Sequence, residues 1–155
     1  MSEPTLIPYI VVRDAAAAIE FYKKAFGAVE IGRHLAPGTN KIMHARVSID
    51  GNTLMLSDDF SEEMGYPSMT PESLGGSPLT LHLRVENADI TFERAINAGA
   101  MEIMPPQDQF WGDRYAQFVD PLGHRWAVLH TIKQMTPEEV DAAAKKYVWE
   151  KKEAK

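Results

Sequence analysis

The chain has 155 residues, 45% hydrophobic and 25% charged, a balance typical of one ordinary globular domain. Its formal net charge of -6 argues against nucleic acid or an anionic membrane as a partner, and the lack of cysteine excludes disulfides and thiolate metal sites. The first residues have no signal-peptide pattern and no apolar run has membrane-spanning length, so we expect a cytoplasmic protein.

The first part of the chain predicts a strand, a helix and a second strand in succession. Residues 7–12 are apolar and β-branched, as in a buried strand. Asp14 is a suitable N-cap for the following helix, because its carboxylate can accept hydrogen bonds from the free N–H groups. Gly27 suits the left-handed position after a helix, and residues 29–34 continue as a strand.

Two further strands complete this predicted module. Residues 41–50 alternate between apolar and polar positions, which indicates a strand with one buried face. A hairpin turn at residues 50–52 leads into a return strand over residues 53–57. The side facing the helix is expected to hold Met43, Ala45, Val47, Ile49, Leu54 and Leu56, and the opposite side His44, Arg46, Ser48, Thr53, Met55 and Ser57.

Residues 59–78 have a different composition, rich in proline, glycine, serine and threonine, with scattered aromatic and methionine residues. Long segments of this kind are uncommon within compact domains and are usually functional or disordered. We therefore expect a linker that acts as a lid or as a partner-contacting loop.

The second half repeats the order of the first. Residues 81–103 again give strand, cap, helix, glycine turn and strand, with Asn87 as the cap, and residues 99–103 match residues 27–31. An internal repeat is stronger evidence of fold than any single motif. The sequence therefore predicts two βαβββ modules, residues 5–58 and 79–132, within one domain.

The remaining elements follow from turn and capping residues. Alternation over residues 79–85 directs Leu79 and its apolar neighbours to the helix, and the strand that starts at Met101 is expected to stop at Pro105-Pro106. A turn at residues 120–123 separates the last two strands. Thr136, followed by proline and two glutamates, predicts a helix over residues 136–155.

Several of these segments resemble the vicinal oxygen chelate superfamily, which includes glyoxalase I, bleomycin-resistance proteins and extradiol dioxygenases. The resemblance is carried by residues 8–22, by Met-His-Ala-Arg-Val over residues 43–47, by residues 110–115 and by residues 120–126, and is closest to the PhnB-like branch. It implies an α+β fold in which tandem βαβββ modules form a curved, incompletely closed mixed sheet barrel. A C-terminal helix follows, and a homodimer is implied.

The superfamily commonly chelates a divalent metal through His, Gln and Glu side chains on four strands. The corresponding positions here fall near Ile7, Met55, Thr80 and Ala127, none of which is an imidazole or carboxylate. We therefore expect no metal at the usual site and predict no cofactor, while relocated ligands stay an alternative.

The concave side of the barrel is expected to bind a small-molecule ligand. By alternation, with two residues from the loop before the seventh strand, its lining should include Ile7, Tyr9, His44, Arg46, Met55, Ser57, Thr80, His82, Trp111, Arg114 and Gln117. His44 and His82 are candidate acid/base residues, because imidazole titrates near neutrality. Each can equally be a histidine satisfied by its neighbours.

Arg46 can bind a carboxylate or phosphate, or pair with Asp58 or Glu30 at the sheet surface. Trp111 and Arg114 can stack on a planar ligand, or lie in a subunit contact. Two functions stay open: sequestration of a small molecule in the cup of a homodimer, as in bleomycin-resistance proteins, and a lyase, isomerase or oxidoreductase of the glyoxalase or dioxygenase type. A partner-binding dimer with a vestigial cup is the third reading.

Overall fold

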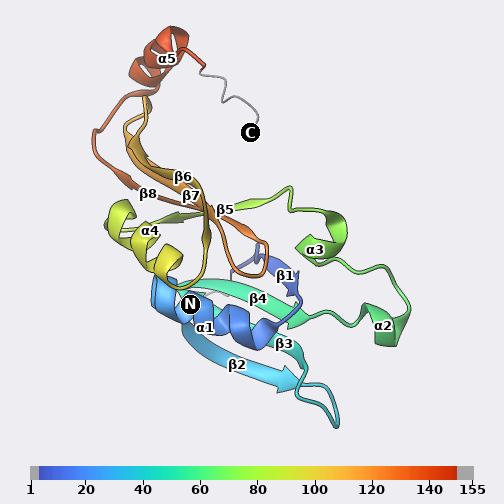
Figure 1. Ribbon diagram of the computed structural model, residues 1–155. Helices are drawn as coiled ribbons and strands as arrows, with labels where there is room; N and C mark the ends of the chain where they lie inside the picture. Colours follow the sequence, from blue (N-terminus) through green and yellow to red (C-terminus); the bar gives the residue numbers. More distant parts are fainter. Residues whose placement is uncertain (1–3, 150–155) are drawn as a thin grey trace.

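The computed structural model describes residues 4–149 and contains two four-stranded sheets, each accompanied by one long helix (Figure 1). In sheet A the strands β1 (Tyr9–Val12), β2 (Val29–Leu35), β3 (Ile42–Ile49) and β4 (Asn52–Asp58) have the order β1-β4-β3-β2. In sheet B the strands β5 (Thr80–Arg84), β6 (Met101–Asp108), β7 (Asp113–Val119) and β8 (Arg125–Thr131) have the order β5-β8-β7-β6. The first and last strands of each unit are parallel, so the predicted βαβββ repeat is confirmed.

The two long helices begin where the capping residues predict. Helix α1 (Ala15–Phe26) starts at Asp14, whose carboxylate accepts a hydrogen bond of 3.0 Å from the backbone of Ala17, and ends at Gly27 with a φ of 66°. Helix α4 (Ala88–Asn97) starts at Asn87, which accepts from the backbone N–H of Ile90. The repeated cap residues thus produce the repeated helices.

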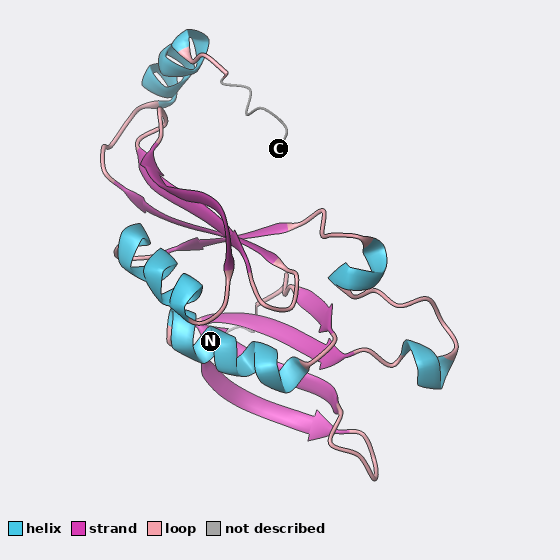
Figure 2. Cartoon of the chain, viewed as in Figure 1, coloured by secondary structure: helices cyan, strands magenta, loops and turns pink. Residues whose placement is uncertain are grey.

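Helices α1 and α4 lie beside each other between the two sheets, and the core is formed around them (Figure 2). Aromatic rings from both halves meet here: Phe26 of α1 lies 4.7 Å from Trp126 of β8 and 6.1 Å from Phe118 of β7, measured between ring centroids. Trp126 and Phe118 are almost completely buried. The two βαβββ units are therefore joined through one hydrophobic core.

A buried carboxylate also holds the two units together. Asp120, in the turn between β7 and β8, accepts hydrogen bonds from the Tyr22 hydroxyl at 2.7 Å and from the Trp126 indole N–H at 3.0 Å. Burial, with the neighbouring Asp120 carboxylate, raises the pKa of Tyr22 well above its usual value, so this hydroxyl stays protonated and can donate. The residue expected only to form a turn is therefore also a contact between the two halves of the chain.

Two strand predictions need correction. Ile42 is fully buried and Met43 is 49% exposed, the reverse of strict alternation, because the β2–β3 register shifts between His34 and Leu35. Strand β6 also continues through Pro105 and Pro106 to Asp108. Proline is tolerated there because β6 is an edge strand with its own register shifts, so a missing N–H need not break the ladder.

The segment between the units is not structureless. It contains two short helices, α2 (Ser61–Met64) and α3 (Pro71–Leu74), and Thr70 caps α3 by accepting a hydrogen bond from the backbone of Ser73. Glu72 of α3 forms an ion pair with Arg13, whose guanidinium also donates to the backbone carbonyl of Pro121. Helix α3 is thus attached to both halves of the chain.

The C-terminal helix α5 (Pro137–Lys146) starts at Thr136, as predicted, and lies at the end of the molecule opposite sheet A (Figure 2). The chain leaves the helix at Tyr147 in an extended conformation, so the described helix is shorter than expected, and residues 150–155 lie outside the described part. No helix within residues 4–149 is both long and apolar enough to cross a membrane.

Candidate functional site

The open face of sheet B, which we define as the side turned away from α4, carries a set of adjacent polar and aromatic residues. Along β7, Tyr115 and Gln117 lie on this face, and Ala116 and Phe118 lie on the helix side with the core. Gln117 and His82 are both register partners of Ala127 on the central strand β8. The pairing therefore places His82, Ala127 and Gln117 in one row across the sheet.

A cavity of about 410 Å³ lies over this face. Most of its lining is aromatic or apolar, with a few polar groups, which is the usual composition of a small-ligand site. It is lined by His82, Met104, Gln109, Phe110, Trp111, Asp113, Tyr115, Gln117, Leu129, Tyr147 and Trp149.

A short chain of hydrogen bonds lies in this cavity. The side-chain amide of Gln117 donates to the Tyr115 hydroxyl at 2.8 Å, and the hydroxyl lies 3.3 Å from Nε2 of His82. His82 Nε2 can accept the Tyr115 proton when the neutral imidazole carries its proton on Nδ1, and it can donate to the Tyr115 oxygen in the other tautomer. The arrangement can bind a polar ligand group or move a proton between Tyr115 and His82.

A tight turn supplies the aromatic side of the cavity. The Trp111 ring lies 5.7 Å from that of Tyr115 and 5.1 Å from that of Phe110, and its indole N–H donates to Asp113 at 3.0 Å. Gly112 allows this turn, since it has a φ of 97° and a side chain there would lie 2.3 Å from the carbonyl oxygen of Lys133. The turn therefore holds Trp111 against the sheet.

Arg114 does not join this site. It lies on the other face of β7, where its guanidinium donates to Asp89 at the start of α4 (2.9 and 3.1 Å) and to Asp108 at 3.0 Å. The hydrogen bond from Arg114 lowers the pKa of Asp89, and the negative charge is also favourable in the first turn of a helix. Its structural role is to connect β7, β6 and α4.

A second group of expected residues lies on the open face of sheet A, the side turned away from α1. Tyr9, Met55 and Arg46 are successive register partners across β1, β4 and β3. His44 has its Nδ1 3.4 Å from the Tyr9 hydroxyl. Within one chain, these residues and the His82 group lie on different sheets (Figure 1).

Other residues enter these two groups without having been anticipated. His34 pairs with His44 across β2 and β3, with ring centroids 6.3 Å apart, but the register shift on either side of it obscures this in the sequence. Tyr115 shares the alternation of Gln117, so the sequence did contain a signal for it. Thr80, in contrast, was expected in the lining; it opens β5 two residues before His82 and is half-buried, and it is not among the residues that line the cavity of about 410 Å³.

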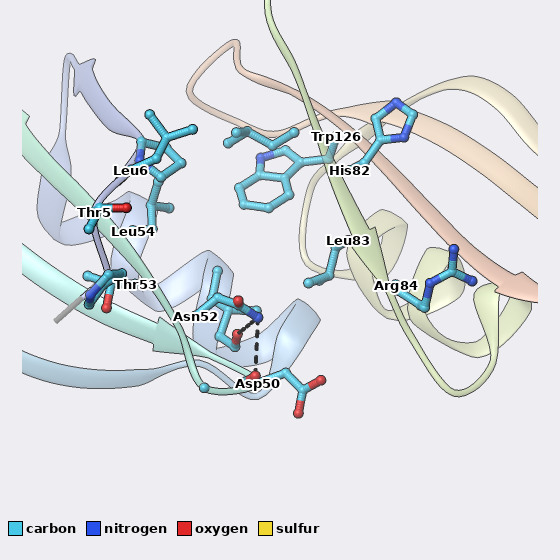
Figure 3. A pocket seen from close by; sticks show the side chains of 15 residues that line it. Thr5, Leu6, Asp50, Asn52, Thr53, Leu54, His82, Leu83, Arg84 and Trp126 are labelled. Atoms are coloured by element: carbon cyan, nitrogen blue, oxygen red, sulfur yellow. Dashed lines mark hydrogen bonds between the residues drawn. The ribbon is translucent and has the colours of Figure 1, made fainter. Parts of the chain in front are cut away.

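A larger cavity, about 810 Å³, lies between the two units beside the β3–β4 hairpin (Figure 3). Leu83 points into it. His82 and Arg84 also belong to its lining, but their side chains point to the other side of β5 (Figure 3). The Asn52 amide is used inside the hairpin, donating to the carbonyls of Ile49 and Asp50. Because its polar groups do not converge as those of the smaller cavity do, we place the candidate site on sheet B.

Comparison with known proteins agrees with this fold. Residues 5–128 match the model of the glyoxalase, bleomycin resistance protein and dioxygenase superfamily. The chain belongs to this superfamily. It is 49% identical over 142 residues to an uncharacterized protein of Mycobacterium bovis, covering 91% of this chain and 92% of that one.

Solved structures extend the comparison. The crystal structure of TioX from Micromonospora sp. ML1 superposes with a TM-score of 0.61 at 25% identity, covering 86% of this chain and 100% of that one. A PhnB protein from Bacillus cereus, described as a putative 3-demethylubiquinone-9 3-methyltransferase, has the same fold, with a TM-score of 0.62, 14% identity and coverage of 83% and 100%.

The residues at the expected metal positions do not fit a divalent ion. Met55 and Ala127 provide a thioether and a methyl group, and Thr80 provides only a hydroxyl, whereas such an ion needs imidazole or carboxylate donors. Within residues 4–149, no three His, Cys, Asp or Glu side chains are grouped so that they could hold a metal together.

Proposed function

We propose that the protein binds a small organic molecule in the cavity on the open face of sheet B. The observation that carries this proposal is the combination of an aromatic lining with the hydrogen-bonded chain of Gln117, Tyr115 and His82 at one side of the cavity. Apolar rings exclude water from a ligand body, and a few fixed polar groups determine its orientation. A ligand with a compact apolar body and one polar edge fits both features.

The cavity is proposed to be completed by a second copy of the chain. Strands β1 and β5 are edge strands of their sheets, and Tyr9, on the open face of sheet A, is 49% exposed. Free edges of this kind are usually covered in native proteins. Because α1 and α4 pack against each other inside one chain, the open face of sheet B is proposed to face sheet A of a partner chain. The partner's Tyr9 and the partner's His44, whose rings are in contact in each chain, would then lie towards the ligand.

Crystal soaking with a chemically diverse fragment library tests the binding proposal. We expect fragments to collect in the 410 Å³ cavity, with a polar group at His82 or Gln117. The variant His82→Ala should weaken their binding about tenfold, because one hydrogen bond to the ligand is lost, whereas Leu79→Ala, just before the same strand, should not. Fragments that collect instead in the larger cavity, or affinities unchanged in His82→Ala, would contradict the proposal.

A catalytic role is the second candidate, and the contact of Tyr115 with His82 is the observation that favours it. A tyrosine and an imidazole in contact can exchange a proton with a bound substrate. The fragments that bind most tightly can be incubated with the protein and followed by mass spectrometry. Conversion that is lost in both His82→Ala and Tyr115→Phe would favour an enzyme, and binding without conversion would favour sequestration.

A further inference from the structure

The candidate cavity continues into an unbroken series of aromatic rings that reaches the last described residue. Beyond Tyr115, Trp111 and Phe110, the ring of Tyr147 lies 4.9 Å from that of Phe110, and the ring of Trp149 lies 5.1 Å from that of Tyr147. Both C-terminal rings line the same cavity as His82. Tyr147 and Trp149 therefore form part of the wall of this cavity.

Backbone hydrogen bonds hold the start of the part of the chain that leads through α5 to Tyr147 and Trp149. The carbonyl of Gly112, in the turn that carries Trp111, accepts hydrogen bonds from the backbone N–H groups of Ile132 at 2.9 Å and Lys133 at 3.0 Å. Helix α5 starts three residues later at a well-formed cap, in which Thr136 accepts from Glu139. The chain then leaves α5 at Tyr147 with a ψ of 130° and passes next to Phe110. The turn that positions Trp111 thus also positions the segment with Tyr147 and Trp149.

Packing of the free protein does not account for these large rings. Trp149 is 84% exposed and Tyr147 is 42% exposed, and no residue of α5 is buried. A helix of this length gains little stability by itself, so its packing does not require a tryptophan after its end. The family model also ends at residue 128, before α5. The two rings thus lie outside the part of the chain that the family model matches.

We propose that Tyr147 and Trp149 are ligand-binding residues that select a flat aromatic molecule, stacked between them and the Trp111–Tyr115 side of the cavity. This inference rests on the proposed binding function and specifies its ligand class. Aromatic rings attract one another at centroid separations of about 4.5–7 Å, and a planar ligand can meet rings of the cavity at such separations. On binding, the exposed indole of Trp149 loses contact with water, which adds to the affinity.

The polar groups of the cavity indicate that this molecule is uncharged. Asp113 is the carboxylate that lines the cavity among residues 4–149; it already accepts the Trp111 N–H and lies 3.9 Å from the guanidinium of Arg84. The other polar side chains, His82, Gln109 and Gln117, can be neutral donors and acceptors. They suit a hydroxyl, carbonyl or ring nitrogen at one edge of the ligand.

Two bicyclic alcohols can test this inference: 1-naphthol, which is flat, and decahydro-1-naphthol, which has the same carbon skeleton without aromatic rings. Their affinities for the full chain are measured by isothermal titration calorimetry. We expect 1-naphthol to bind more tightly than the saturated alcohol, and Tyr147→Ala combined with Trp149→Ala to weaken 1-naphthol about tenfold. The matched control is Val148→Ala, which removes a side chain 78% exposed between the two rings and should leave the affinity unchanged.

The outcomes separate this inference from the binding proposal. Because both rings are exposed in the free protein, the double variant should melt within about 2 °C of the original chain, so a loss of affinity is not a loss of fold. If fragments collect on sheet B in soaked crystals but the double variant binds 1-naphthol as before, the proposed role of Tyr147 and Trp149 is overturned and the binding site on sheet B stands. Equal affinities for the flat and saturated alcohols would also overturn that role. An absence of fragments at sheet B would instead overturn the binding proposal itself.

Discussion

At the scale of single residues, Asp120 shows how one carboxylate can stabilise two structural units at once. It is 3% exposed and accepts four hydrogen bonds: from the side chains of Tyr22 and Trp126 and from the backbone N–H groups of Leu122 and His124. Both oxygens are therefore used as acceptors, one by the turn and one by the two aromatic side chains. The same residue closes the β7–β8 turn and attaches it to α1.

The variant Asp120→Asn should lower the free energy of unfolding by about 2–3 kcal/mol. The NH₂ group of the asparagine would face at least one of the four donors, and that donor would be left buried without an acceptor. Tyr22→Phe is the matched comparison: it removes one donor and leaves Trp126 bound, so we expect a loss of about 1.5 kcal/mol. Urea unfolding of both variants provides the measurement. An Asp120→Asn chain as stable as the original would show that the four contacts contribute little.

The sequence could predict which residues share a face of a sheet wherever strict alternation holds. His82 and Gln117 were placed correctly on one face because β5 and β7 have regular registers with β8. Arg114 was misplaced because it was assigned to a loop, whereas β7 already begins at Asp113 and turns Arg114 towards α4. The pairing of His34 with His44 depends on a register shift that no local pattern reveals.

At the scale of elements, the connection between the two units is attached to the second unit through α3. Pro71 at the start of α3 is buried, and its Cβ lies 2.6 Å from where a side-chain carbon on Gly123 would be. The composition of residues 59–78 predicted a linker but could not show these contacts, because Arg13, Glu72 and Pro121 are distant in the sequence. Whether this segment also acts as a lid stays a prediction.

Gly123→Ala should therefore destabilise the protein by about 2–3 kcal/mol, since it combines a φ of 93° with a clash against Pro71. The control is Gly38→Ala, which has a φ of 72° but no atom within 4 Å of the added carbon and should cost about 1 kcal/mol. Thermal and urea unfolding measure both losses. Limited proteolysis within residues 59–78 should become faster in Gly123→Ala only, and equal losses in the two variants would argue against close docking of α3.

At the scale of the whole molecule, the two open faces raise the question of how one binding site is completed. One chain carries Tyr9 and His44 on sheet A and His82 and Tyr115 on sheet B, and the packing of α1 against α4 leaves these groups on separate sheets. The resemblance to the superfamily predicted the cup but not whether its two halves belong to one chain. The contacts of α1 with α4 favour a cup shared between two chains.

A mixture of two variants distinguishes the arrangements. His44→Ala damages sheet A and His82→Ala damages sheet B, so each homodimer should bind 1-naphthol about tenfold more weakly than the original. In a mixed dimer with sites shared between chains, one site carries both substitutions and the other carries none. We therefore expect co-expressed, differently tagged variants to yield a mixed dimer that binds one 1-naphthol per dimer with the original affinity.

Sites contained within single chains would each keep one substitution in the mixed dimer, and the original affinity would not return. The experiment requires that the protein is a dimer. Sedimentation velocity at micromolar concentration should therefore show a particle of twice the 17.3 kDa chain mass. A monomer would contradict the shared cup, as would a His44→Ala homodimer with unchanged affinity, because sheet A would then have no part in the site. Recovery in the mixed dimer requires contributions from both chains, since neither variant alone carries an undamaged pair of faces.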